Sequence, residues 1–303
     1  MIFHKKILHI ETTNRCTLKC PACPRTVWQN LIKQPIKKQD LNIKELQKFL
    51  DCDAGEKIET FLLCGDYGDT IYYPDLFELI KTFRHKKFEI RTNGSYRNKE
   101  WWGQLNNMLN ENDTVVFGID GLYQENKKYR INSDWSSIET AIETLSKGKA
   151  KLMCQTIIFN FNYKKLDQIK QWAENNGLEW FAMKTSRFGD QALIPADKEI
   201  VDVKEMYQEA FEKKEPINIV PRCLEASVIT SEGYFMLCDW IRNPLTFYRS
   251  ELYLDRQKWI DRLKISDINL NIAYEVLNEW IENVKIKAKN GQAEVLCKMK
   301  CRK

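Results

Sequence analysis

Short apolar runs alternate with longer amphipathic stretches along the first two thirds of the chain. The apolar runs are rich in β-branched and aromatic residues, as buried strands are. The stretches between them repeat apolar residues at three- and four-residue steps, as helices that pack on one face do. We predict strands at 7–11, 60–64, 88–91, 114–119, 152–158 and 179–184, and helices at 43–50, 75–83, 99–109, 135–145 and 163–175. This alternation is typical of βα units, so we predict an α/β fold with a partial (β/α)6 TIM-like barrel.

The alternation stops near Pro195. Residues 196–214 have the pattern of a helix that leads out of the barrel, and Pro216 and Pro221 mark the junction after it. Residues 223–238 predict a β-hairpin with its turn at 231–233, and residues 272–289 predict a long helix. We therefore predict two domains, a barrel over residues 1–195 and a small C-terminal α+β extension over residues 196–303.

The composition is that of a globular protein whose thiols stay reduced. The chain has 303 residues, of which 43% are hydrophobic, enough for a barrel-sized core and a smaller appendage. It has no run of about eighteen apolar residues, and its N-terminus enters a strand without the pattern of a signal peptide. We expect a cytoplasmic protein with no membrane partner. Its ten cysteines are then metal ligands, redox groups or buried thiols rather than disulfides.

Three cysteines, Cys16, Cys20 and Cys23, follow the first predicted strand in a C-x3-C-x2-C pattern. Three thiolates are one fewer than a closed four-iron cluster needs, so a metal group held here keeps an open position for a substrate or cofactor. The residues alone leave two other interpretations open. One is a structural zinc completed by His4 or His9, and the other is a set of unrelated core thiols.

The triplet resembles the signature of the radical S-adenosylmethionine (radical SAM) enzymes, which lies in the loop after the first barrel strand. The resemblance implies a 4Fe–4S cluster on Cys16, Cys20 and Cys23 whose open iron binds the amino and carboxylate groups of SAM. It also implies cleavage of SAM to methionine and a 5′-deoxyadenosyl radical, which removes a hydrogen atom from the substrate. The family usually has an aromatic residue where this chain has Ala22, a departure that bears on one adenine-stacking contact and not on the cluster.

The loops after the other predicted strands resemble SAM-binding segments of the same family. Parallel α/β sheets place their chemistry at these carboxyl ends of strands, although each short sequence is also an ordinary turn. Residues 64–69 resemble the Gly-Gly-Glu motif that binds the amino group of SAM, with Asp69 in place of Glu. Residues 92–94 resemble the ribose-facing segment, and Arg187 is a candidate clamp for a carboxylate of SAM or of a substrate. The predicted SAM-binding residues are Gly65, Asp66, Tyr67, Gly68, Asp69, Thr92, Asn93, Asp120, Asn160, Asn162 and Arg187.

A second group of cysteines lies beyond the predicted barrel, at the two ends of the hairpin and near the C-terminus. Its members are Cys223, Cys238, Cys297 and Cys301. The arrangement resembles the twitch and SPASM extensions of radical SAM enzymes, and four cysteines match the shorter twitch type better. The resemblance implies an auxiliary 4Fe–4S cluster with no open iron. One alternative is a zinc site with four cysteine ligands, and another is that Cys297 and Cys301 lie in a frayed tail and bind nothing.

Three cysteines belong to neither group. Cys52 ends a predicted amphipathic helix and is expected to pack in the core. Cys64 and Cys154 lie on predicted barrel strands near the proposed site. Each is either a buried inert thiol or a donor of a hydrogen atom to a substrate radical, as an epimerase requires.

These patterns and the resemblance together predict a radical SAM enzyme that modifies a peptide or protein by oxidation, cross-linking or epimerisation. An electron donor such as flavodoxin or ferredoxin is then an expected partner. The alternatives are a dehydrogenase of small aminated or sugar-like molecules, an RNA-modifying radical SAM enzyme, and a non-catalytic iron–sulfur or zinc module. Only the basic residues crowded near the C-terminus favour RNA. Because the net charge of +5 is mild for this length, we do not expect a nucleic-acid partner.

Overall fold

The computed structural model describes residues 6–65, 67–184, 216–224, 227–241, 247–248 and 250–301. Internal contacts divide the chain into two compact units. The barrel unit contains residues 11–40 and 60–197, and the C-terminal unit contains residues 1–10, 41–59 and 198–303. Each unit has strands and a buried apolar core of its own.

Within the described residues, the barrel unit is built on five parallel strands that pair in sequential order. They are β2 (Thr60–Leu63), β3 (Lys87–Thr92), β4 (Thr114–Gly118), β5 (Lys151–Ile158) and β6 (Glu179–Lys184). In the middle strand β4, three successive residues, Val115, Val116 and Phe117, are all buried. Burial on both faces explains why this strand reads as a continuous apolar run. The parallel order brings the carboxyl ends of the five strands to one edge.

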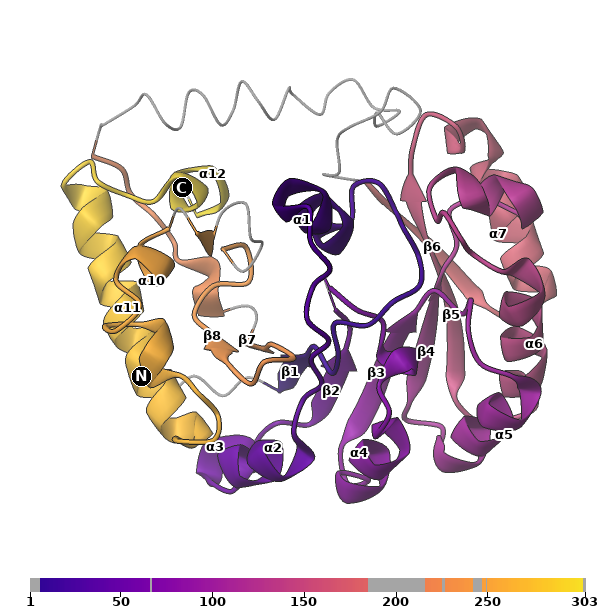
Figure 1. Cartoon of the computed structure of the whole chain (residues 1–303), viewed down its shortest axis with the longest axis horizontal. Helices are drawn as coiled ribbons and strands as arrows, with labels where there is room; N and C mark the ends of the chain where they lie inside the picture. Colours follow the sequence, from indigo (N-terminus) through magenta and orange to yellow (C-terminus); the bar gives the residue numbers. More distant parts are fainter. Residues whose placement is uncertain are drawn as a thin grey trace. The chain divides into compact units, whose positions relative to one another are not determined.

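Helices cover the outer side of these strands (Figure 1). The helices of this unit are α1 (Pro24–Ile32), α4 (Leu76–Thr82), α5 (Lys99–Met108), α6 (Trp135–Leu145) and α7 (Leu166–Asn175). Its 3-10 segments are η1 (Thr70–Tyr72), η2 (Tyr123–Lys128) and η3 (Tyr163–Lys165). Asn98 and Asp134 cap α5 and α6 by accepting hydrogen bonds from backbone N–H groups of the first turn. The apolar face of α5 meets the sheet at Trp102, whose ring lies 6.2 Å from that of Phe117 on β4.

The C-terminal unit combines the first strand of the chain with the predicted hairpin. β1 (Ile7–Ile10) pairs in parallel with β7 (Ser227–Ile229), and β7 pairs antiparallel with β8 (Phe235–Met236). In the hairpin turn, Gly233 has a φ of +77°, a left-handed conformation that favours glycine. The helical elements are α2 (Ile43–Leu50), α3 (Asp53–Glu56), η5 (Arg222–Leu224), α10 (Glu251–Leu254), η6 (Ile260–Arg262), α11 (Leu270–Lys289) and α12 (Val295–Lys300).

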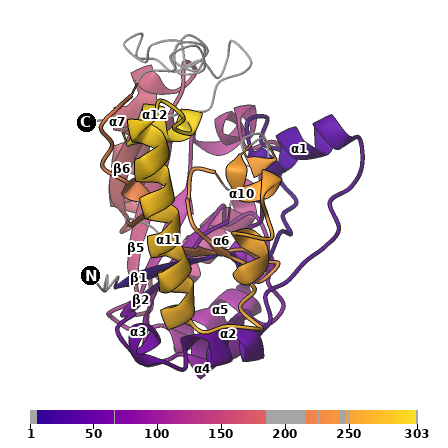
Figure 2. The ribbon, with the colours of Figure 1, turned by 90° about the vertical axis from the view of Figure 1, so that its left-hand side faces the viewer.

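Helix α11 runs along this unit, and α12 follows beyond its C-terminal end (Figure 2). Trp280 on α11 is wholly buried, and its ring lies 5.0 Å from that of Trp259. The rings of Phe235 on β8 and Phe49 on α2 lie 6.0 Å apart, so the hairpin packs on the first helix of the unit. Although α11 spans 20 residues, no helix in the described part of the chain is both long and apolar enough to cross a membrane.

The predicted strands agree with the observed ones to within one residue at each end. The predicted domains differ from the units, because strand pairing joins β1 to β7 and α3 packs against α11. Residues 1–10 and 41–59 therefore group with the C-terminal unit rather than with the barrel. The predicted boundary between residues 195 and 196 and the predicted helix 196–214 lie outside the described residues.

Candidate active site

The three cysteines of the triplet lie in one loop that is anchored at its middle and at its end. Cys23 is the N-cap residue of α1, and its N–H donates to Cys20 O at 3.1 Å, which folds the end of the loop into a tight turn. Lys19 N–H donates to Ile131 O at 3.0 Å and ties the middle of the loop to the segment after η2. These two hydrogen bonds fix the middle and the end of the loop.

An apolar cluster supports this loop and gathers the three thiol-bearing residues. Its buried members are Leu18, Cys20, Tyr129, Ile157 and Phe159, and Cys16, Ala22 and Cys23 pack against it. The rings of Tyr129 and Phe159 lie 4.5 Å apart. All three cysteines therefore contact the same apolar cluster, which places them on one side of the loop's support.

Burial controls the protonation of the Cys16 thiol. Desolvation raises its pKa to about 12, the carboxyl of Asp69 adds to the rise, and the guanidinium of Arg25 opposes it. The thiol is therefore protonated at neutral pH, and a metal has to displace that proton to bind.

A pocket of about 830 Å³ opens beside the triplet and extends over the strand ends. The lining includes all three cysteines and six of the predicted SAM-binding residues, namely Gly65, Tyr67, Gly68, Asp69, Thr92 and Asn93. The structure thus brings the triplet together with the loops after β2 and β3. Asp66 and Arg187 lie outside the described residues.

Asp69 and Asn93 connect these two loops to the triplet. The buried Asp69 carboxylate accepts hydrogen bonds from Asn93 N–H at 2.6 Å, from the Asn93 side-chain amide, and from Ile71 N–H at 3.2 Å. The Asn93 amide also donates to Cys16 Sγ at 3.7 Å. Burial raises the pKa of Asp69, and the backbone hydrogen bonds from Asn93 and Ile71 oppose the rise. In this structure Asp69 orients Asn93, and Asn93 contacts the cysteine.

Gly68 allows the loop after β2 to lie directly against the cysteine loop. A Cβ atom at this position would stand 2.0 Å from the backbone oxygen of Thr13. The next residue, Asp69, donates its N–H to Arg15 O at 2.9 Å. Glycine is required here because the backbones of the two loops lie too close together for a side chain.

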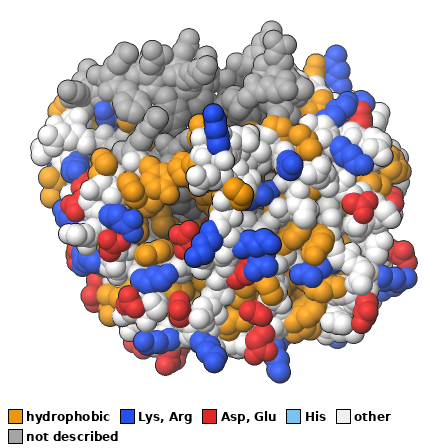
Figure 3. Space-filling model, viewed as in Figure 1, with side chains coloured by type: hydrophobic (Ala, Val, Ile, Leu, Met, Phe, Trp, Pro, Cys, Tyr) orange, Lys and Arg blue, Asp and Glu red, His pale blue; other side chains and the backbone are white. Residues whose placement is uncertain are grey.

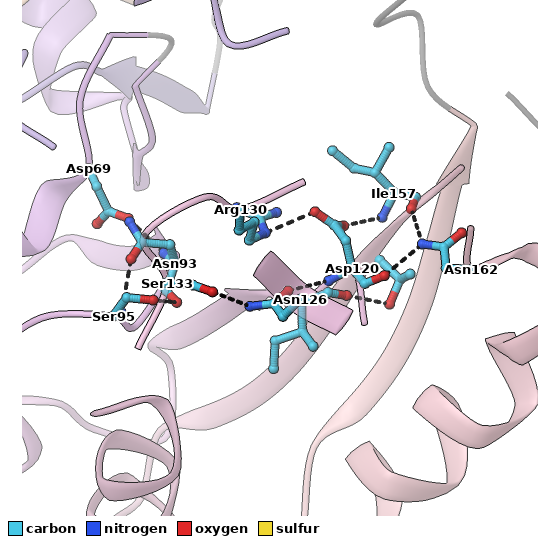
Figure 4. A network of polar contacts seen from close by, with 11 residues as sticks. Asp69, Asn93, Ser95, Asp120, Asn126, Arg130, Ser133, Ile157 and Asn162 are labelled. Atoms are coloured by element: carbon cyan, nitrogen blue, oxygen red, sulfur yellow. Dashed lines mark hydrogen bonds and ion pairs between the residues drawn. The ribbon is translucent and has the colours of Figure 1, made fainter. Parts of the chain in front are cut away.

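Arg130 lines the pocket and was not predicted from the sequence. Its Nε lies 2.9 Å from Oδ2 of Asp120 in an ion pair in which the carboxylate side chain is wholly buried. The other Asp120 oxygen accepts from Ile157 N–H at 2.8 Å, and Figure 4 shows Arg130 pointing toward this carboxylate. The guanidinium lies over Gly118, where an added Cβ would stand 2.5 Å from an Arg130 nitrogen. Arg130 follows a lysine-rich 3-10 segment that resembles a solvated surface, so the sequence carried no signal for it.

Asn162 holds the ends of β4 and β5 together. Its side-chain amide donates to the backbone oxygens of Asp120 and Ile157, each at 2.8 Å, and its side-chain oxygen accepts from Phe159 N–H at 2.7 Å (Figure 4). Asn160 is exposed. The described lining of the pocket does not include Asp120, Asn160 or Asn162. In this structure Asp120 positions Arg130 and Asn162 holds the strand ends, and the SAM contacts expected of these residues stay predictions.

The two candidate hydrogen-atom donors occupy different environments. Cys64 lines the pocket beside the triplet. Cys154 is wholly buried on β5, burial raises its pKa to about 12, and it is not among the described residues that line the pocket. Only Cys64 is placed where a donor to a bound substrate would have to be.

The second group of cysteines converges within the C-terminal unit. Cys223, Cys238, Cys297 and Cys301 are all buried. Hydrogen bonding joins Cys223 to Cys238 and Cys297 to Cys301, and the first bond lowers the pKa of Cys223 while raising that of Cys238 well above its usual value. The hydrogen bond with Cys301 and burial raise the pKa of Cys297. Because Cys297 and Cys301 are buried on and directly after α12, the alternative of a frayed tail is wrong.

Four cysteine thiolates are the ligand set both of a closed four-iron cluster and of a structural zinc ion. The burial and pairing of the four thiols fit either metal group.

Residues 10–174 match the family model of the radical SAM superfamily. Since this match covers more than half of the chain, the protein belongs to the radical SAM superfamily. The predicted enzyme class is confirmed, and the family implies a 4Fe–4S cluster and SAM as cofactors.

Solved structures of known proteins are similar to this chain in fold. The structure of native anSMEcpe with bound AdoMet and the Cp18Cys peptide superposes with a TM-score of 0.58 at 15% identity, covering 93% of this chain and 83% of that chain. The structure of Streptococcus suis SuiB bound to the precursor peptide SuiA gives 0.57 at 13% identity, covering 84% and 67%. These similarities confirm the mixed α/β fold, with a partial barrel and a C-terminal α+β extension. The tungsten-containing aldehyde ferredoxin oxidoreductase cofactor-modifying protein of Pyrococcus furiosus is 22% identical over 261 residues, covering 80% of this chain and 68% of that protein.

Proposed function

We propose that this protein is a radical SAM enzyme that modifies a peptide or protein. The observation that carries the proposal is the single pocket in which the cysteine triplet, the Asp69–Asn93 pair and Arg130 converge. Two similar solved structures contain bound peptides, which favours a peptide among the possible substrates.

In this proposal Cys16, Cys20 and Cys23 would hold a 4Fe–4S cluster beside the pocket that they line. When bound, the cluster and SAM supply a 5′-deoxyadenosyl radical that removes a hydrogen atom from the substrate. Arg130 offers a guanidinium for the carboxylate of SAM, the role that the sequence suggested for Arg187. Asp69 keeps Asn93 beside Cys16.

Cys223, Cys238, Cys297 and Cys301 are the proposed ligands of an auxiliary 4Fe–4S cluster in the C-terminal unit. Their burial and pairing provide four thiolate ligands in one unit, and the similarity to anSMEcpe and SuiB favours an iron–sulfur cluster over zinc. A closed cluster of this kind accepts or relays an electron, so it suits a net oxidation or a cross-link better than a redox-neutral epimerisation.

A second candidate substrate is a non-peptide cofactor. It rests on the similarity to the Pyrococcus furiosus protein, whose name describes it as modifying a cofactor. On the face in Figure 3, the coloured Lys and Arg side chains are interspersed with Asp and Glu rather than gathered in one field, so this face does not favour the RNA-modifying alternative.

Substrate class is tested by anaerobic turnover of the reconstituted enzyme with SAM and dithionite. A substrate is expected to increase the yield of 5′-deoxyadenosine and to leave with an altered mass. We expect this coupling with a peptide that carries a modifiable side chain, and not with the same residues supplied as free amino acids. Coupling to a non-peptide cofactor with no response to peptides would replace the first candidate with the second.

A further inference from the structure

A second hollow, of about 1540 Å³, opens on another side of the cysteine loop. It shares only Cys16 and Arg25 with the pocket described above. The rest of its lining comes from residues 14–38, from Tyr72 and Pro74 at and after η1, and from the segment 77–101. No strand-end glycine of the first pocket lines it. The two cavities therefore approach the triplet from different directions.

The second hollow is cationic. It is lined by four basic residues, Arg15, Arg25, Lys38 and Arg97, and by no acidic residue among those described. Arg15 is paired with Asp40. Arg25, Lys38 and Arg97 form no ion pair within the described residues, and the buried Nε of Arg25 has no hydrogen-bond partner there. The Arg25 guanidinium donates to Leu18 O. Three positive charges without an ion-pair partner among the described residues thus line a concave surface next to Cys16.

The Arg97 side chain is held in place by a backbone carbonyl and two aromatic rings. Its backbone has a φ of +86°, a strained conformation for a residue with a side chain. Its Nε donates to Ile71 O at 2.7 Å, and its guanidinium carbon lies 4.9 Å from the ring of Tyr96 and 4.8 Å from the ring of Trp101. These contacts use one nitrogen and leave the two terminal nitrogens as a fork that matches a carboxylate.

Aromatic rings complete the surface. Tyr72 and Tyr96 are stacked with their ring centroids 4.4 Å apart, and the Tyr72 hydroxyl is hydrogen-bonded to Thr17 in the cysteine loop at 2.5 Å. Phe77 and Trp101, whose rings lie 5.1 Å apart, form the outer part of the lining. Cations set among rigid aromatic rings are typical of the centre of a protein interface.

We propose that this hollow receives an acidic segment of the protein that supplies electrons to the cluster, a one-electron donor carrying a reduced flavin or an iron–sulfur centre. The inference rests on the proposed function. One electron leaves the donor, which is oxidised by one unit, and enters the cluster on the triplet, which is reduced by one unit. A donor must reach the triplet without displacing SAM or substrate from the first pocket, and the second hollow touches Cys16 from outside that pocket.

The test compares the double variant Lys38→Gln/Arg97→Gln with a control that removes two lysines elsewhere in the barrel unit, Lys147→Gln/Lys170→Gln. The probe is oxidised bacterial flavodoxin, titrated by calorimetry against the reconstituted enzyme at low salt. We expect the dissociation constant to rise about tenfold or more in the first variant and to change by less than about twofold in the control. The difference should shrink as salt screens the charges.

Measuring 5′-deoxyadenosine formation with two different reductants shows whether the hollow binds the electron donor or the substrate. At limiting reduced flavodoxin, 5′-deoxyadenosine formation should fall in Lys38→Gln/Arg97→Gln, whereas turnover with dithionite should match the wild type. Equal losses with both reductants, or an unchanged flavodoxin affinity, would overturn the proposal. Lys38→Glu, at an exposed position, repeats the test without disturbing Arg97. If the wild type forms no 5′-deoxyadenosine with dithionite, the proposed function itself fails, and the binding titration still reports on the hollow.

Discussion

The guanidinium of Arg130 and the carboxylate of Asp120 form a buried ion pair beside the candidate SAM pocket, with Nε and Oδ2 2.9 Å apart. Asp120 is fully enclosed and bonded to the backbone of β5, so it fixes the position of the arginine. Arg130 extends from there over Gly118 into the pocket. The pair thus connects the frame of the barrel to the place where a carboxylate ligand would bind.

Removing this arginine should be costly for stability. Arg130→Met leaves the Asp120 charge buried without its partner, and we expect the free energy of unfolding to fall by about 3–5 kcal/mol. The double variant Asp120→Asn/Arg130→Met removes both charges and should recover part of the loss. Urea denaturation of the wild type and both variants measures this coupling. A loss below about 1 kcal/mol in Arg130→Met would show that the pair is not buried as described.

Substitution of Gly68 should disrupt the cluster site. In Gly68→Ala, the new methyl group meets the backbone of Thr13, so the loop after β2 has to move away from the cysteine loop. We expect less iron bound by the triplet and a lower melting temperature. Gly103→Ala is the matched control, because no atom lies within 4 Å of a Cβ there and alanine favours the helix. Equal iron content in the two variants would contradict the close packing of the loops.

The buried Asp69 should make stability depend on pH. Its pKa is raised above the usual value of 3.8, so the folded state holds its proton more tightly than the unfolded chain. Stability contributed by this group is therefore greatest below pH 3.8 and falls as the pH rises through the raised pKa. Asp69→Asn, which stays neutral, should lack this decrease. Urea denaturation of both proteins at a series of pH values from 4 upward measures the difference, and parallel curves would contradict it.

The four cysteines of the C-terminal unit should bind about half of the iron in the reconstituted protein. We expect about eight irons per chain in the anaerobically reconstituted wild type and about four in Cys297→Ala/Cys301→Ala. Metal analysis that includes zinc and sulfide measures both. About four irons with one zinc in the wild type would make the site structural and favour redox-neutral chemistry.

Periodicity located the strands because each is buried and therefore continuous in apolar residues, as β4 is. The cysteine triplet could also be predicted as a metal site, since its three cysteines are close together in the sequence. What the sequence did not reveal depends on contacts between distant segments. Arg130 enters the pocket only because Asp120 fixes it, and Asn162 is drawn away from the pocket by hydrogen bonds to Asp120 and Ile157. The pairing of β1 with β7, which moves the start of the chain into the C-terminal unit, is likewise invisible in the pattern of either strand.

The most direct test of radical SAM chemistry is 5′-deoxyadenosine formation from SAM under anaerobic reduction by dithionite. The wild type and Cys52→Ala, which changes a cysteine outside both groups, should form it at similar rates. Cys20→Ala should form none, because a triplet with two thiolates does not hold the cluster that cleaves SAM. Formation of 5′-deoxyadenosine by Cys20→Ala at the wild-type rate would contradict the assignment of the triplet and, with it, the account of the site.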